Sequence, residues 1–403
     1  MKKILTILVS ILIMVPFNEA ISCTSAIFTG KVTKDGRPLL LKHRDTGELN
    51  NRIEYFQGPK YGFLALVDSP SEGGVAWSGS NNAGFSIINT ASYNLKDDDV
   101  PSSMMDREGE LMYKALGECK NLKDFEYFLD TLSRPMGVEG NFGVIDAEGG
   151  AAYYEVNNHK WNKLDVNDPE VAPNGYFIVT NFSYTGREDE GMGYIRNCNT
   201  TYNVENYVLK EGGKVDPQWI FENISRSFYH SLLEVDLRKD QGLASGWFID
   251  QDFVPRRSSS ASMVFQGVKP GEDVSKTVMW TILGYPPLGV AVPMVVANGE
   301  NIPSFMVKSE SSENAQMCDM VLELKKNVFP VKRGNGNKYF RFNYLYNKEG
   351  TGYSQQLKEV ENYIFDKFDR DLSPKKLDTL YDEYFGKIEK AYENMIKKKA
   401  TNK

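Results

Sequence analysis

Cys23 is the residue of this sequence best placed for chemistry, because a leader segment ends directly before it. Lysines at positions 2 and 3 precede an apolar run at 4–17, and Ala20-Ile21-Ser22 has the small-x-small pattern of a signal-peptide cleavage site. Cleavage after Ser22 leaves a cysteine that carries both a thiol and a free α-amine. Because such an amine has a pKa of about 8, it can act at neutral pH as the base for its own thiol. One residue then supplies both nucleophile and base.

Two other interpretations of Cys23 stay open. It could be an ordinary buried cysteine of a strand, or the acylated cysteine of a lipoprotein, whose blocked amine could not act as a base. Ala20 stands where a lipid-attachment site usually has Leu, which favours cleavage without lipidation. The apolar run is also shorter than the ~20 residues that a membrane-spanning helix needs. We therefore expect an exported bacterial protein, periplasmic or secreted, without a transmembrane span.

Composition and motifs exclude several other functions. The 403 residues are 41% hydrophobic and 25% charged, as in an ordinary globular protein, and the net charge of −7 argues against a nucleic-acid partner. The sequence has no Gly-x-Ser-x-Gly elbow, phosphate loop or His-Glu-x-x-His motif, and its four cysteines form no CxxC. We expect neither a metal nor an organic cofactor. A papain-like pairing of a cysteine with His159 or His230 stays open.

The elements that must position Cys23 begin with a hairpin. Thr24–Val32 and 38–42 are strand-like runs, and Asp35-Gly36 between them is a strong hairpin signal. Further runs have the composition of strands, at 62–67, 74–78, 85–90, 142–145, 151–156, 176–180, 262–268 and 277–283. Helical patterns occur at 108–115, 122–132 and 217–230, and from 355 onward.

Runs of strands with helices grouped between them predict an α+β protein built on antiparallel sheets. Two such sheets packed face to face would account for the many buried strands. The Lys/Glu-rich tail from Gln355 predicts two helices split at Ser373-Pro374, which we expect to pack on the catalytic body; partner binding is the alternative. The expected organisation is a signal peptide at 1–22, a catalytic domain at 23–345 and a C-terminal helical extension at 346–403.

A family resemblance becomes visible from Cys23 to about Asn298. Cys23-Thr24-Ser25, the Asp35-Gly36 hairpin and Lys42-His43-Arg44-Asp45 resemble the opening of the choloylglycine hydrolase and penicillin V acylase family. They are more similar still to the related acyl-coenzyme A:6-aminopenicillanic acid acyltransferases and cysteine dipeptidases. The resemblance extends to about residue 298 through short motifs at 81–85, 89–90, 179–181 and 284–287. It implies a four-layer αββα fold and an N-terminal cysteine that cuts or forms amide bonds.

The resemblance also implies roles for three further residues. Asp45 would hold the freed α-amine of Cys23, which fits its place at the end of the second strand of a hairpin that starts at Cys23. The alternative is a turn or cap aspartate. Asn89 would give a backbone N–H, and Asn181 a side-chain amide, to an oxyanion hole. Asn181 could instead be a turn residue after an apolar strand.

The cations of the family are matched less well. The family has an arginine three residues before the aspartate, where this chain has Lys42, while Arg44 stands directly before Asp45. Either cation could lower the pKa of the thiol. A second family arginine has its nearest match in Arg256-Arg257, and we take Arg257 as the candidate. His43, next to these residues, is interpreted as structural.

Together these observations predict acyl transfer through a Cys23 thioester, with a small-molecule amide as substrate. Water or another amine could resolve the thioester, so hydrolase and acyltransferase stay open. Bile-acid amides, penicillin-type amides, N-acyl amino acids and short peptides remain candidate substrates, and a homo-oligomer is compatible with the sequence. The non-enzymatic alternative is an exported lipoprotein, anchored through Cys23, that binds a ligand.

Overall fold

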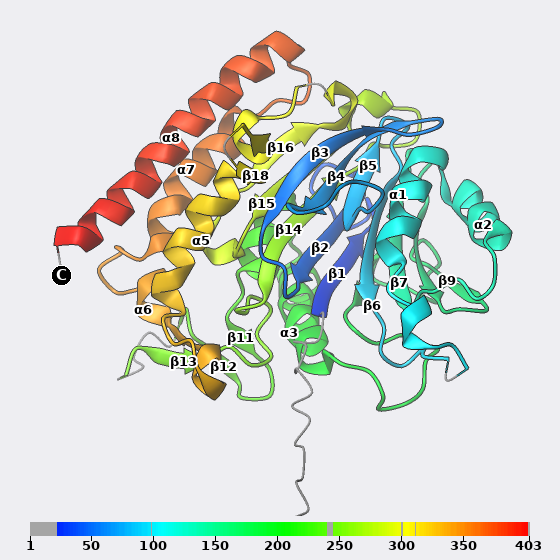
Figure 1. Cartoon of the computed structure of the whole chain (residues 1–403), viewed down its shortest axis with the longest axis horizontal. Coiled ribbons are helices and arrows are strands. Elements are labelled where there is room, and N and C mark those ends of the chain that lie inside the picture. The colour runs from blue at the N-terminus through cyan, green and yellow to red at the C-terminus, as the bar shows by residue number, and fades with distance from the viewer. Residues whose placement is uncertain (1–21, 98, 240–244, 300, 311, 402–403) are drawn as a thin grey trace, which may run out of the picture.

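The computed structural model describes residues 22–97, 99–239, 245–299, 301–310 and 312–401 (Figure 1). Apart from Ser22, the predicted signal peptide at 1–22 lies outside the described residues. Within the described ranges, no helix combines the length and the apolar character that crossing a membrane requires.

The first of two large sheets carries Cys23. Its strand order is β10-β1-β2-β14-β15-β16, and all neighbours are antiparallel. The strands span Tyr176–Val179 (β10), Ser22–Phe28 (β1), Leu39–Asp45 (β2), Ser259–Gln266 (β14), Val278–Leu283 (β15) and Val292–Val295 (β16). The predicted hairpin is therefore β1–β2, at the centre of the sheet. Gly36 in its connection has φ +74, a conformation that glycine adopts without strain.

The second sheet is an antiparallel meander in chain order, β3-β4-β5-β6-β7-β8-β9. Its strands span Asn51–Gln57 (β3), Gly62–Asp68 (β4), Ser78–Asn81 (β5), Ser86–Ala91 (β6), Gly140–Ile145 (β7), Ala151–Val156 (β8) and Trp161–Asp165 (β9). Strands β6 and β7 pack face to face on β1 and β2, so the two sheets form the middle of the molecule.

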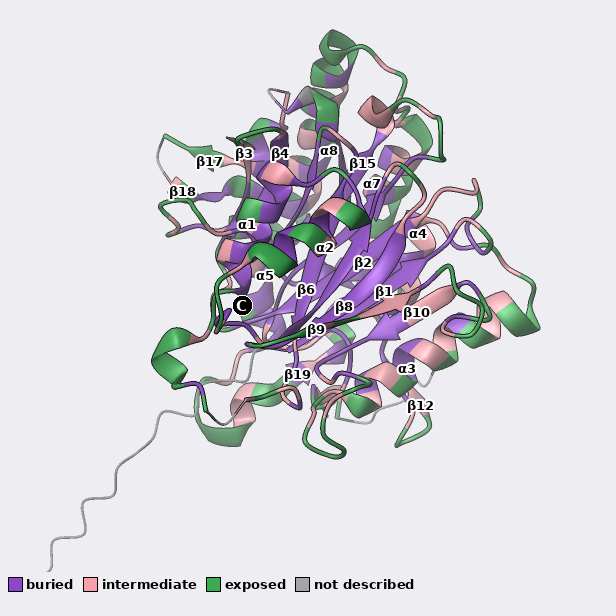
Figure 2. Ribbon diagram, turned by 90° about the vertical axis from the view of Figure 1, so that its right-hand side faces the viewer, coloured by how far each residue is buried: buried purple, intermediate pink, exposed green. Residues whose placement is uncertain are grey.

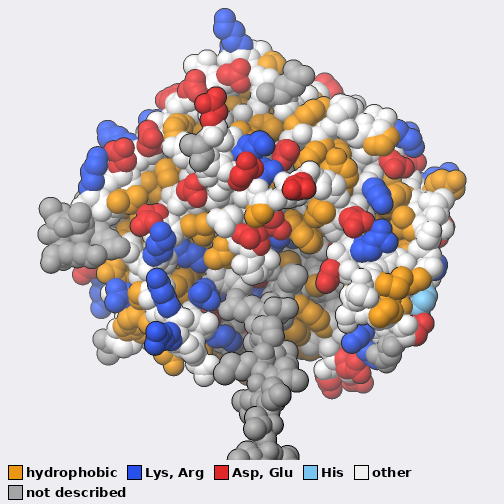
Figure 3. All heavy atoms as spheres, in the orientation of Figure 1, with side chains coloured by type: hydrophobic (Ala, Val, Ile, Leu, Met, Phe, Trp, Pro, Cys, Tyr) orange, Lys and Arg blue, Asp and Glu red, His pale blue; other side chains and the backbone are white. Residues whose placement is uncertain are grey.

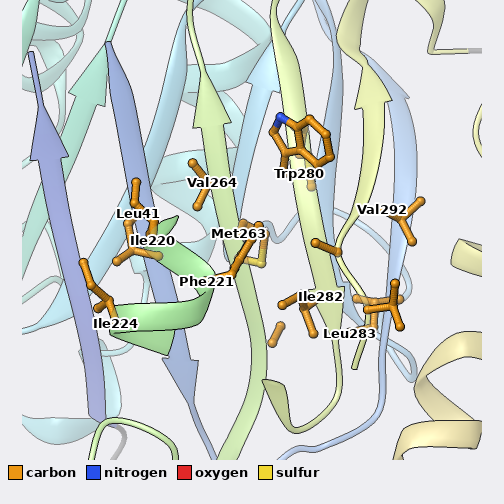
Figure 4. Close-up of a cluster of buried hydrophobic side chains, with 14 of the residues drawn as sticks. Leu41, Ile220, Phe221, Ile224, Met263, Val264, Trp280, Ile282, Leu283 and Val292 are labelled. Atoms are coloured by element: carbon orange, nitrogen blue, oxygen red, sulfur yellow. The ribbon is translucent and has the colours of Figure 1, made fainter. Parts of the chain in front are cut away.

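Helices cover the outer face of each sheet, which completes a four-layer αββα sandwich (Figures 1 and 2). Glu108–Glu118 (α1) and Leu122–Thr131 (α2) enclose a core with the second sheet. The first sheet is covered by Tyr194–Glu205 (α3), Pro217–Ile220 (α4), Gln316–Val328 (α5) and Tyr353–Lys367 (α7). Phe342–Leu345 (α6) packs on α5 and α7, and Pro374–Thr401 (α8) packs on α7. In Figure 4, Ile220 and Phe221 project from the helical layer onto Leu41 and Met263 of this sheet. The predicted fold class is confirmed.

Strands β1 and β2 are buried on both faces although they carry polar and charged residues. Every residue of these two strands is buried, including Lys42, Arg44 and Asp45. Charged groups are rarely buried unless they are paired, so such a concentration at one end of a sheet indicates a site.

Two predicted elements are wrong. No strand forms at 74–77, because Gly73 and Gly74 take positive φ values of 103 and 77; β5 begins only at Ser78. The predicted helix at 217–230 is α4 followed by a π-helical turn, Phe221–Ser225, and it ends there. The chain then turns so that Phe228 packs against Phe253 and other rings of the core.

The C-terminal tail packs on the body, as expected. Helix α8 begins at Pro374, the predicted break, and α7 ends at Lys367. Phe365 of α7 stacks on Trp280 of β15 at 4.2 Å, and Glu361 pairs with Arg226 at 2.5 Å. The division of the chain at residue 345 stays a prediction.

Candidate active site

The β1–β2 register sets which groups surround Cys23. Cys23 lies opposite Arg44, and Ser22 lies opposite Asp45. Because directly opposed residues project on the same face of a sheet, the thiol shares a face with Arg44 and with Lys42, two residues along. That face is turned toward the second sheet, since Lys42 and Arg44 both bond to groups there. The Cys23 side chain is 2% exposed.

Lys42 lies on the Cys23 face of the hairpin and is bonded to groups of the second layer. Its ammonium group donates to the carbonyl oxygen of Trp77 at 2.7 Å and to the side-chain oxygen of Asn89. Burial lowers the pKa of Lys42 to about 8, against an opposing attraction from Cys23. Arg44 is committed elsewhere: it pairs with Asp68 at 2.8 Å and lies over the Trp77 ring at 4.9 Å. Of the two cations left open by the sequence, Arg44 thus has a carboxylate partner and Lys42 donates to neutral oxygens; which of them acts on the thiol stays a prediction.

Asn181 holds the backbone nitrogen of Cys23. Asn181 lies two positions after the end of β10, and its side-chain oxygen Oδ1 accepts hydrogen bonds from the Cys23 N–H at 2.8 Å and from the Ser22 hydroxyl at 3.1 Å. Its Nδ2 donates to the carbonyl oxygen of Ala91 at 2.9 Å. Asn181 is fully buried and forms a bridge with Met192 on the far side of a loop. The structure thus brings Asn181 to Cys23; its oxyanion role stays a prediction.

Asn89 lies on β6 of the second sheet, opposite Phe142 of β7. Its side-chain oxygen accepts a hydrogen bond from the Lys42 ammonium group, and this bond joins the two sheets next to the Cys23 face. The predicted contribution of its backbone N–H to an oxyanion hole also stays a prediction.

Asp45 lies at the same end of the hairpin as Cys23, as expected, but it points to the other face of the sheet. Its carboxylate accepts a hydrogen bond from Ser259 Oγ at 2.5 Å and forms an ion pair with Arg256. His43 Nε2 lies 3.4 Å from Asp45 Oδ1. Burial opposes its charge, yet Arg256 and His43 outweigh burial and hold the pKa of Asp45 well below its usual range. Here Ser22 precedes Cys23, and the role of Asp45 toward a freed amine stays a prediction.

Arg256, and not Arg257, is the arginine paired with the predicted site carboxylate. The backbone N–H of Arg257 donates to Asp250 at 2.6 Å instead. The two arginines lie in a turn before β14, in which the Ser259 N–H donates to the Arg256 carbonyl oxygen at 2.9 Å, and it is the Arg256 side chain that reaches Asp45. Burial raises the pKa of Asp250 to about 6.

Sequence reasoning missed Arg196. This residue of α3 is fully buried, and it donates to the carbonyl oxygen of Cys23 at 2.5 Å and to Thr24 Oγ1 at 3.0 Å. It also donates to Ser22 Oγ and to Asn181 Oδ1, both at 2.7 Å. Burial and the charge of Arg256 lower the pKa of Arg196 to about 9. The surrounding segment is polar and carries no motif, so nothing in the sequence singled it out.

The histidines have other surroundings. His43 is fully buried and hydrogen-bonds Ser259 Oγ at 2.9 Å through Nε2. His159 pairs with Asp99 at 3.2 Å near the surface, and His230 packs edge-on against Phe253. Among the hydrogen bonds of the described residues, none joins a histidine to Cys23.

The other cysteines are less suited to nucleophilic chemistry. All four are free, and only Cys198 is exposed. Burial raises the pKa of Cys119 to about 12 and that of Cys318 to about 11, which keeps both as thiols at neutral pH.

On the face seen in Figure 3, acidic and basic side chains are interspersed.

Comparison with known proteins gives distant structural similarity. No family model and no curated protein matches the sequence. A mutant of conjugated bile acid hydrolase from Clostridium perfringens matches 68% of this chain and 92% of its own, at 11% identity and a TM-score of 0.42. The N-acylethanolamine-hydrolyzing acid amidase ortholog of Caenorhabditis elegans matches 60% of this chain and 92% of its own, at 15% identity and a TM-score of 0.38. Penicillin V acylase from Agrobacterium tumefaciens matches 68% of this chain and 86% of its own, at 12% identity and a TM-score of 0.39. Similarity at this distance carries no argument about activity.

Proposed function

We propose that this chain, once cleaved after Ser22, is an exported bacterial cysteine amidase whose nucleophile is Cys23. The observation that carries the proposal is the 2.8 Å hydrogen bond from the Cys23 nitrogen to Asn181 Oδ1. The nitrogen that becomes the α-amine is thereby held in place at the end of a central strand. The thiol of the same residue has the Lys42 cation as an electrostatic neighbour.

The chemistry is acyl transfer in two steps. The α-amine takes the thiol proton, and the Cys23 sulfur attacks the carbonyl carbon of the amide to form a tetrahedral oxyanion. The Asn89 N–H and Asn181 Nδ2 donate to that oxygen; Nδ2 has two hydrogens, and Ala91 takes one of them. The C–N bond breaks as the ammonium returns its proton to the leaving amine. Water then cleaves the thioester, which releases a carboxylic acid and restores the thiol.

The substrate class that fits is a linear non-peptide amide or a small N-acyl compound. An amine in place of water would take the acyl group from the same thioester, so acyltransferase activity belongs to the proposal. Asp45, Arg256 and Lys42 act by charge around Cys23, and no step requires a metal or an organic cofactor. The amidase domain is residues 23–345, with the helices beyond it as an extension.

Intact mass and turnover test the proposal together. Protein exported by a bacterial host should have the mass of residues 23–403 without lipid, and it should hydrolyse at least one member of a panel of bile-acid, penicillin-type and N-acyl amino acid amides. Cys23→Ala should abolish that turnover. Cys198→Ala, which removes the exposed thiol, is the matched control and should leave it unchanged. A diacylglycerol mass on Cys23 would instead establish the lipoprotein alternative.

A further inference from the structure

The guanidinium of Arg196 joins the nucleophile strand to the Asn181 side chain. Through Nη1 it binds the Cys23 carbonyl oxygen and Thr24 Oγ1, and through Nη2 it binds Asn181 Oδ1. The planar fork of an arginine can serve two such groups at once, whereas a lysine offers one point charge. Asn181 Oδ1 is the same atom that accepts the Cys23 N–H. One oxygen therefore lies between the Cys23 nitrogen and a buried cation.

These contacts also fix which way the Asn181 amide points. With Oδ1 held by Arg196 and Cys23, the Nδ2 group must lie on the opposite side, where it donates to Ala91 of β6. A rotated amide would set N–H groups against the guanidinium, two donors facing each other. Arg196 therefore imposes the orientation in which Nδ2 can donate to a developing oxyanion.

The start of α3 is built around this arginine. Gly193, directly before the helix, has φ +80, and a Cβ added there would lie 2.2 Å from Arg196 Nη2. A side chain at position 193 would thus displace the guanidinium. The hydroxyl of Thr180, next to Asn181, donates to the Gly193 carbonyl oxygen at 3.1 Å and ties the two segments together.

The charged side chains near the Cys23 nitrogen form two groups: members of ion pairs, and cations that donate to neutral oxygens. On β2, Arg44 pairs with Asp68, and Asp45 pairs with Arg256 from the segment before β14, with His43 beside it. Arg196 from α3 and Lys42 from β2 instead donate to neutral oxygens at the distances given above. A further titratable neighbour is Tyr93, whose pKa burial and Cys23 raise. Arg196 is attracted to Asp45, but that carboxylate already has Arg256 as its ion-pair partner.

We propose that Arg196 is a positioning residue of the reaction, which orients the Asn181 amide and places a fixed positive charge beside the α-amine of Cys23. The inference rests on the proposed function and concerns a residue that the sequence did not mark. A neighbouring cation disfavours a second one, so the amine remains uncharged at a lower pH than an isolated amine of pKa about 8. It is then free to take the thiol proton near neutrality.

Three variants of α3 test this inference in the mature enzyme. Arg196→Gln removes both the positive charge and the planar guanidinium. It should lower kcat about 10²-fold, because misplacement of a reacting group has an effect of that size, and it should change KM little. The acidic limb of kcat/KM should move up toward pH 8, because the amine regains its ordinary pKa. Arg196→Lys keeps the charge, so the limb should stay in place while kcat falls. Asn197→Ala, which removes a contact of the next residue to the Ile178 carbonyl, is the matched control and should keep both parameters.

A double-mutant comparison shows whether Arg196 acts through Asn181. If it does, adding Arg196→Gln to Asn181→Ala should lower kcat by much less than it does in the wild-type background. Circular dichroism and thermal melting identify a variant that fails to fold; the Arg196→Lys kinetics then decide.

The outcomes separate the inference from the function it builds on. An Arg196→Gln enzyme with wild-type kcat and an unmoved acidic limb overturns the inference, as does an Arg196→Lys enzyme with wild-type kcat. If Cys23→Ala keeps full turnover, the proposed function itself fails, whatever the Arg196 variants do.

Discussion

The ammonium group of Lys42 on β2 donates a hydrogen bond to the side-chain oxygen of Asn89 on β6, and this bond joins the two sheets beside Cys23. Lys42 is fully buried, and the attraction of Cys23 partly offsets the effect of burial on its charge. Lys42 is therefore the cation whose replacement should alter the reactivity of the Cys23 sulfur.

Lys42→Met should therefore slow the alkylation of Cys23 by iodoacetamide at pH 7, whereas Lys42→Arg should change the rate little. The rate is measured from pH 5 to 10 in a Cys198→Ala background, so that the exposed thiol does not interfere. An identical pH dependence in Lys42→Met and the parent would show that Lys42 has no influence on the thiol.

Asn181→Ala should lower turnover by roughly 10²–10³-fold, the usual effect of removing one oxyanion donor. The loss should appear in kcat more than in KM, since the donor acts on charge that develops in the transition state. Steady-state kinetics against the best substrate of the panel measure both. A loss below about threefold would reduce Asn181 to a turn residue.

Asp45→Asn should destabilise the fold, because it leaves Arg256 buried without its counter-charge. Breaking one side of a buried ion pair costs about 3–5 kcal/mol of unfolding free energy. Urea denaturation should show part of that loss restored in the Asp45→Asn/Arg256→Gln double variant. Arg257→Gln keeps the backbone N–H that Asp250 accepts and should cost much less. Equal losses for Arg256→Gln and Arg257→Gln would contradict the assignment of Arg256.

Glu108 gives the protein a pH-dependent stability. Burial raises the pKa of this α1 carboxyl to about 7 in the folded protein, above its ordinary value of 4.5. Between those values the folded chain binds more protons than the unfolded one, so Glu108 contributes stability at low pH that is lost as pH rises toward 7. Glu108→Gln should reduce this fall in unfolding free energy between pH 4.5 and 7. The nearby Glu110→Gln should leave it as in the wild type; if the two variants behave alike, the assignment to Glu108 is wrong.

The sequence predicted the parts of the site that local signals determine. Asp35-Gly36 marks a hairpin, and a hairpin that starts at Cys23 brings its second strand back to that end, so Asp45 could be placed beside Cys23 without a structure. The layers followed from strands in runs with helices grouped between them.

Long-range contacts decided the rest. Arg196 meets Cys23 across 173 residues of sequence, from a helix whose polar composition carries no sign of a site. The choice between Arg256 and Arg257 depends on the direction of one residue before β14, which composition does not specify. At Gly73 and Gly74, backbone conformation overrode a strand-like pattern.

The α-amine of Cys23 is the base in the proposed reaction, and a change of that nitrogen alone tests this role. Two cytoplasmic forms without the leader are compared: one made as Met-Cys23, from which the host aminopeptidase removes Met, and one with a non-removable extension before Cys23. Both retain the thiol, but in the second the neighbouring nitrogen is an amide, which has essentially no basicity.

The measurement is kcat/KM of the two forms from pH 5 to 9, with circular dichroism to show that both are folded. We expect the trimmed form to turn over, with a rate that rises as the amine loses its proton, and the extended form to be at least about 10²-fold slower at every pH. Full activity of a folded extended form would contradict the account and would return His43, His159 and His230 to consideration as the base.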